Sequence, residues 1–215
     1  MNKHPRSDVA VNKLAYNDVE SIRSYEKDRF SGLLGRRRDA RERRASHAAI
    51  QQFTRDSTVL DCPCGNGRWF ERLGFRAGKI IARDVAPEMV KAAAERAVLG
   101  VEIDTGVDDA EHLELADDAV DHVWCFALMK HLPDDMKRRV LREFARVASS
   151  RIAVSFCVTN PVSQAVWRAR GSRGYPNTEE ELTAICASAD LSIGALYSVS
   201  LPVVGLETIA VLERR

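Results

Sequence analysis

An aspartate and two glycines stand close together in the segment VLDCPCGNG, and their spacing predicts a ligand site at the end of a strand. The apolar run before Asp61 predicts a buried strand, which leads into a turn and then a helix. Gly65 and Gly67 lack a Cβ, so the backbone can turn sharply and a ligand can approach closely. Ligands of open α/β sheets bind outside the carboxyl ends of the strands, where Asp61 offers a carboxylate. An acid at this turn repels pyrophosphate and favours a ligand with a positive charge, such as an ammonium.

Three further segments supply polar or small groups at the ends of predicted strands. Asp84 ends KIIARD, where a carboxylate can accept hydrogen bonds from both hydroxyls of a ribose. Asp109 follows a third strand and can accept a hydrogen bond from the amine of adenine. Cys125 and Phe126 end a fourth strand, within VDHVWCFA. Because parallel strands end at the same edge of a sheet, these groups predict a single site.

A parallel sheet is needed to bring these residues together, and the sequence predicts one. Strands separated by helices imply βαβ units with right-handed crossovers. We expect strands over 57–62, 79–84, 101–103, 120–127 and 151–156, and two final strands around 191–200 and 207–212. Helices are expected over 66–73, 87–99, 133–147 and 178–189, the last with Thr178 and Glu181 in capping-box spacing.

The first 54 residues are expected to form a helical extension before an α/β domain over residues 55–215. Two helices are predicted within 16–54, broken near Gly32 and Gly35, and the second carries the basic run RRRDARERR. Such a run is usually a solvated helix face with internal ion pairs. The alternative is that the run binds an anionic acceptor substrate, such as a phosphorylated sugar, a lipid head group or a nucleic acid.

Composition limits the function classes. The chain has 215 residues, a net charge of +1, 45% hydrophobic and 29% charged residues, which is ordinary for a globular protein. This charge makes nucleic acid an unlikely partner, and no apolar stretch approaches the roughly 18 residues that span a bilayer. Five cysteines lack zinc-ligand spacing, so we expect no metal and a cytoplasmic location. Oligomeric state is left open.

In order and spacing, these segments resemble the class I S-adenosylmethionine-dependent methyltransferases. The resemblance rests on VLDCPCGNG, ARDVAPEMV, DDAEHLELADDAVDHVWC, LREFARVASSRIAVSF and NTEEELTAICASADL, and covers roughly residues 55–213. It implies a Rossmann-like α/β fold, with a mostly parallel seven-stranded sheet whose last strand is antiparallel and with helices on both faces. It also implies S-adenosylmethionine as the cofactor. The cofactor-binding residues expected on this basis are Arg29, Asp61, Cys62, Gly65, Gly67, Asp84, Val85, Met89, Asp109, Ala110, Cys125 and Phe126.

Each part of the cofactor has an expected place in this resemblance. Asp61 and the two glycines line the methionine part, and Asp84 takes the ribose. Met89 packs on adenine, whose amine Asp109 holds. Two departures from the family pattern are Pro63, where glycine is common, and Arg83, which we expect to reach solvent or pair with a local acid.

Two residues outside the cofactor motifs are candidates for direct roles. His131, in LMKHL, lies where an acceptor would sit and is the candidate general base, although a histidine there is more often a supporting group. Arg29 is expected to clamp the methionine carboxylate, or else to be an ordinary exposed helical residue. Residues 16–35 are expected to form a lid over the cofactor.

The reaction expected from these features is direct methyl transfer to a small-molecule or biosynthetic acceptor. The NPPY-type motif of amino-group methyltransferases is absent, because ALMKHL follows the fourth strand. Two alternatives remain: a non-catalytic cofactor-binding partner with the same fold, and an NAD-dependent oxidoreductase, against which Asp61 argues. The acceptor atom is left open.

Overall fold

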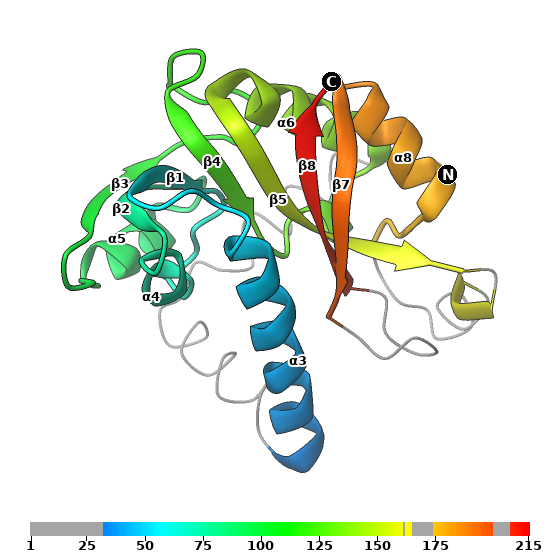
Figure 1. The fold of residues 1–215 in the computed structure, drawn as a ribbon, viewed down its shortest axis with the longest axis horizontal. Helices are drawn as coiled ribbons and strands as arrows, with labels where there is room; N and C mark the ends of the chain where they lie inside the picture. The colour runs from blue at the N-terminus through cyan, green and yellow to red at the C-terminus, as the bar shows by residue number, and fades with distance from the viewer. Residues whose placement is uncertain (1–31, 161, 165–173, 200–206) are drawn as a thin grey trace, which may run out of the picture.

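A mostly parallel sheet forms the centre of the computed structural model, which describes residues 32–160, 162–164, 174–199 and 207–215 (Figure 1). The strands follow the order β3-β2-β1-β4-β5-β8-β7, and only β8 runs antiparallel to its neighbours. The predicted seven-stranded sheet with an antiparallel last strand is confirmed. The strand bounds are β1 (Ser57–Asp61), β2 (Ala77–Asp84), β3 (Glu102–Val107), β4 (Val120–Cys125), β5 (Ala148–Thr159), β7 (Leu191–Ser198) and β8 (Glu207–Arg214).

An additional short strand, β6 (Asn177–Thr178), pairs with the end of β5 and was not predicted. It is two residues long, so it leaves no pattern of apolar alternation in the sequence. Through it, the chain before the last helix is attached to the carboxyl end of β5.

Helices cover both faces of the sheet, because each face carries its own apolar core. On one face, α3 (Gly32–Ile50), α4 (Phe70–Leu73) and α5 (Pro87–Ala94) pack around Trp69 and Trp124. On the other, α6 (Asp134–Val147) and α8 (Glu179–Ala187) pack around Phe144 and Phe156. The predicted α/β class and helices on both faces are confirmed, as is the capping box of Thr178 and Glu181.

The helix bounds differ from the sequence predictions at three places. The predicted break near Gly35 is wrong, because α3 begins at Gly32 and continues to Ile50. The second is α5, which ends at Ala94 because the chain then turns so that Val98 packs against the turn at Gly74. The third is α4, which includes only the last residues of the predicted helix over 66–73.

The helix α3 links the two edges of the sheet. Its C-terminal end is fixed at the amino edge, where Phe53 stacks on His122 with ring centroids 4.4 Å apart and the amide of Thr54 donates to His122 Nε2. Its first turns extend beyond the carboxyl edge (Figure 1). Most of the predicted lid, residues 16–31, lies outside the described residues, as does Arg29. Within the described residues, no helix is long and apolar enough to cross a membrane.

Candidate cofactor and acceptor site

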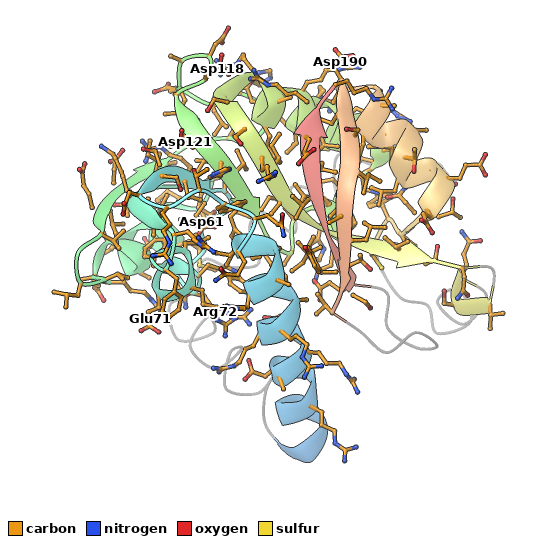
Figure 2. The ribbon with its side chains drawn as sticks, viewed as in Figure 1. Asp61, Glu71, Arg72, Asp118, Asp121 and Asp190 are labelled. Carbon is orange, nitrogen blue, oxygen red and sulfur yellow. The ribbon has the colours of Figure 1, made fainter. Side chains whose placement is uncertain are left out.

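Asp61 is the most unusual polar residue at the carboxyl edge of the sheet. It ends β1 inside the fold, whereas Asp118 and Asp190 lie at the opposite edge (Figure 2). Its side chain is 0% exposed, and neither carboxylate oxygen has a hydrogen-bond partner. Burial raises the pKa of Asp61 well above its usual value, and the nearby carboxylate of Asp84 raises it further. A buried acceptor without a donor is costly, so this position suits a bound cation.

The turn after β1 has the backbone shape that its glycines predicted. Gly65 and Gly67 have φ values of 53° and 75°, in the left-handed region that favours glycine. A Cβ on Gly65 would meet no atom within 4 Å, so the chain there borders open space. The peptide bond between Cys62 and Pro63 is cis.

Asp84 fastens this turn to the end of β2. Its Oδ2 accepts from the amide of Gly65 and its Oδ1 from the amide of Ala86, both at 2.9 Å. Burial raises the pKa of Asp84, although hydrogen bonds from the amides of Ala86, Gly65 and Val85 oppose the rise. A carboxylate has about four acceptor sites, so acceptor capacity remains for a ligand hydroxyl.

The segment after β3 lies beside Asp84. The amide of Asp108 donates to the carbonyl oxygen of Asp84 at 3.1 Å. Next to it, Asp109 is half-buried and accepts from the amide of Glu111 through Oδ1 at 3.1 Å. This hydrogen bond lies within a turn, because the described residues between β3 and β4 contain no helix. Arg83 pairs with Asp104 at 2.8 Å, so its expected pairing with a local acid is confirmed.

The end of β4 completes the cofactor side of the edge. Cys125 and Phe126 are buried, and Asp61 stands in register with Trp124 across β1 and β4. Ala127 follows with φ at 65°, and its amide donates to Ser155 Oγ at 2.7 Å. Burial raises the pKa of the Cys125 thiol, so it stays protonated and does not act as a nucleophile.

His131, the candidate general base, lies in the short helix η1 (Met129–His131) that follows β4. Burial lowers its pKa, Lys130 lowers it further, and Glu207 opposes both. The imidazole is therefore neutral at pH 7 and can accept a proton. Lys130 Nζ lies 3.5 Å from Glu207 Oε1, and the Lys130 carbonyl accepts from the amide of Tyr175.

The basic run on α3 forms ion pairs both along the helix and with the segment after the glycine turn. Arg43 pairs with Asp39 one turn away at 2.6 Å, as expected for a solvated helix face. Glu42, however, is buried and pairs with Arg68, which directly follows the glycine turn. The guanidinium of Arg68 also lies over the ring of Trp69, 4.8 Å from its centroid. The run therefore joins α3 to the turn as well as facing solvent.

The structure brings most of the predicted residues to one edge, and it adds some that the sequence did not indicate. Asp61, the glycine turn, Asp84, the segment around Asp109 and the end of β4 all meet there. Val85 and Met89 begin the connection from β2 into α5, and Val85 is 39% exposed. Residues that sequence reasoning missed are Lys130, Lys137, Ser155, Tyr175 and Glu207, whose contacts at this edge depend on segments far apart in the chain.

Comparisons with known proteins agree with this fold. Residues 59–150 match the family model described as a methyltransferase domain. The chain is 34% identical over 103 residues to methyltransferase GfsG of Streptomyces halstedii, covering 45% of this chain and 36% of that protein. It is 35% identical over 78 residues to a ubiquinone biosynthesis O-methyltransferase of Xanthomonas euvesicatoria pv. vesicatoria (strain 85-10), covering 35% of this chain and 33% of that protein. The match therefore spans about a third of the length of these curated relatives.

A solved structure resembles almost the whole chain. It is magnesium protoporphyrin IX methyltransferase from Synechocystis PCC 6803 with bound SAH, with a TM-score of 0.76 and 16% identity, covering 96% of this chain and 99% of that one. At this identity the likeness shows the fold alone. The chain has the fold of the class I methyltransferases, and residues 59–150 match a methyltransferase-domain family model.

Proposed function

We propose that this chain is an S-adenosylmethionine-dependent methyltransferase that acts on a small-molecule acceptor by direct transfer. The observation that carries the proposal is the buried carboxylate of Asp61, which has no partner and lies beside a second carboxylate, Asp84. Two carboxylates at a strand edge suit a ligand that carries an ammonium and a sulfonium. A dinucleotide pyrophosphate would meet repulsion there.

The residues present fit this cofactor. Asp61 would accept from the ammonium of the methionine part, and the glycine turn would let the backbone lie close to it. Asp84 would use its remaining lone pairs for the ribose hydroxyls, with Asp109 and Ala110 at adenine beside Met89 and Val85. The amide and carbonyl groups of Cys125 and Phe126 would border the amino group. When bound, S-adenosylmethionine supplies an activated methyl group on sulfur.

The residues of the chain would hold the acceptor atom in line with the methyl group and remove the acceptor's proton. Positioning converts the encounter into an effectively unimolecular step and supplies much of the acceleration. His131, neutral at pH 7 and next to the end of β4, would accept the proton of an acceptor hydroxyl and release it to water. Arg29 would bind the methionine carboxylate, and residues 16–35 would cover the site.

An oxygen acceptor is favoured. A hydroxyl becomes a strong nucleophile only as it loses its proton, and the neutral imidazole of His131 can accept that proton. One relative is named as an O-methyltransferase. The basic residues of α3 and α4 support an acceptor with negative charge, and five buried free thiols support a cytoplasmic setting.

Transfer of a labelled methyl group tests the proposal. The full chain is incubated with methyl-labelled S-adenosylmethionine and a panel of phenols, hydroxylated carboxylic acids and primary amines. We expect label in at least one hydroxylated compound, and a His131→Ala variant that binds S-adenosylhomocysteine (SAH) normally but transfers more slowly. SAH binding without transfer to any compound would favour the non-catalytic alternative. Binding of NADH in place of SAH would favour the oxidoreductase.

A further inference from the structure

A buried lysine on α6 joins three parts of the chain near the acceptor side. Lys137 is 0% exposed, and its ammonium donates to Asp134 Oδ1 at 3.0 Å, to the carbonyl of Tyr175 at 2.7 Å and to Asn177 Oδ1. An ammonium has three hydrogens, and all three have acceptors here. The contact partners lie on α6 itself and on the segment that precedes α8.

That segment, residues 175–178, pairs with β5 through β6 and makes further contacts with η1 and α6. The amide of Tyr175 donates to the carbonyl of Lys130 in η1 at 2.9 Å. Asn177 Nδ2 donates to Asp134 Oδ1 at 2.9 Å, and its carbonyl accepts from Thr159 Oγ1 at 3.2 Å. The ammonium of Lys137 is therefore the charged centre that holds the segment against α6 and η1.

Burying this charge is costly for the fold. Burial lowers the pKa of Lys137, while the hydrogen bond and charge of Asp134 oppose the fall. Burial also pushes the pKa of Asp134 upward, but the hydrogen bonds from Asn177 and Lys137 outweigh this, so its pKa lies below the usual value. A well-packed apolar side chain is often as stable as a buried ion pair. Stability alone therefore gives little reason for a lysine at this position, whereas the fixed geometry of its three acceptors does.

We propose that Lys137 is a positioning residue for methyl transfer, because its ammonium fixes residues 175–178 against η1 and so holds His131 at the acceptor edge. The positioning role in catalysis rests on the function proposed above. The mechanical part of the proposal, that Lys137 fixes residues 175–178 against η1, does not depend on that function. Lys137 reaches η1 through the Tyr175 backbone, which accepts from Lys137 and donates to Lys130.

Amide hydrogen exchange followed by NMR tests the mechanical part without an acceptor. In a Lys137→Met variant, the amides of Tyr175 and His131 should exchange about tenfold faster or more, because local opening loses its charged partner. The amide of Val123 in β4 should speed up only as far as global stability falls. The matched control is Lys79→Met, which removes an exposed lysine paired with Glu102 at 2.6 Å and should leave all three rates unchanged.

Activity then tests the positioning role. The dissociation constant of Lys137→Met for SAH should stay within about twofold of the native value. Its kcat, measured with the acceptor identified in the methyl-transfer panel, should fall about tenfold or more. If Lys137→Met does not fold, Asn177→Ala removes one acceptor of the ammonium and should speed the same two amides. Equal acceleration of the Tyr175, His131 and Val123 amides, or unchanged exchange at Tyr175 and His131, would overturn the proposal. Altered exchange in a chain that transfers no methyl group would instead count against the proposed function.

Discussion

Replacing Asp61 with asparagine separates two effects of one buried carboxylate. Asparagine keeps the shape of the side chain and removes its charge. Because burial raises the pKa of Asp61, the folded chain favours the protonated form. The stability that this carboxyl contributes is therefore fully present below its usual pKa, and it is lost as the pH rises through the raised pKa of the folded state. At neutral pH, the cost of ionising this buried carboxyl therefore opposes folding when no ligand is bound.

Both effects have expected magnitudes. Without ligand at pH 7, Asp61→Asn should be more stable than the native chain by about 1 kcal/mol, since an unpaired buried charge costs more than an unpaired buried amide. The same change should weaken SAH binding, because a hydrogen bond that involves a charged group contributes roughly 1.5–3 kcal/mol. That range corresponds to a dissociation constant about 10- to 150-fold higher.

Urea unfolding at pH 7 measures the stability change, and calorimetric titration with SAH measures the binding change. The matched control is Asp104→Asn, which removes a half-exposed carboxylate that pairs with Arg83 outside the cofactor edge. It should change either free energy by less than about 0.5 kcal/mol. If Asp61→Asn binds SAH as tightly as the native chain, the ammonium does not lie at this carboxylate and the reasoning is refuted.

Three other perturbations have defined outcomes. His131→Ala should lower kcat by about 10²-fold or more at unchanged SAH affinity, and an unchanged kcat in steady-state assays would exclude it as the base. Burial lowers the pKa of His122 to about 4, from a usual 6.5. The contribution of His122 to the free energy of unfolding should therefore be complete above pH 6.5, and this free energy should fall by about 3 kcal/mol as the pH drops toward 4. In urea unfolding, the free energy of unfolding of His122→Gln should depend less steeply on pH in that window than that of the native chain. An equal slope would assign the loss of stability to other groups. Thr178→Ala should cost about 1 kcal/mol by removing the capping box of α8, and an unchanged urea midpoint would show that this cap contributes nothing.

Most of the sheet could be predicted from the sequence because its strands are short apolar runs between helical segments. The strand β3 was predicted only over 101–103, because its remaining residues, Asp104 to Val107, alternate weakly between polar and apolar. The end of α5 was missed for a different reason. Residues 95–99 look helical by composition, but Val98 leaves the helix to pack on the turn at Gly74. That contact is tertiary and cannot be read from local propensity.

The residues proposed to bind the cofactor could be found from the sequence, whereas the contacts around Lys137 could not. Asp61 and Asp84 are the last residues of their strands and Asp109 comes shortly after β3, so their position in the sequence already places them at one edge. Lys137 and Glu207 carry no comparable signal. Lys137 reads as an ordinary residue of an amphipathic helix, and its acceptors on Tyr175 and Asn177 lie 38 and 40 residues away in the chain.

A crystal structure of the full chain with bound SAH tests the central claim most directly. We expect the ligand at the carboxyl edge, with its amino group in hydrogen-bond contact with Asp61 and its ribose hydroxyls with Asp84, at normal N–O and O–O distances of about 2.7–3.2 Å. SAH bound elsewhere on the chain, or an edge that remains empty at saturating ligand while both carboxylates keep their present surroundings, would contradict the assignment of this edge as the cofactor site.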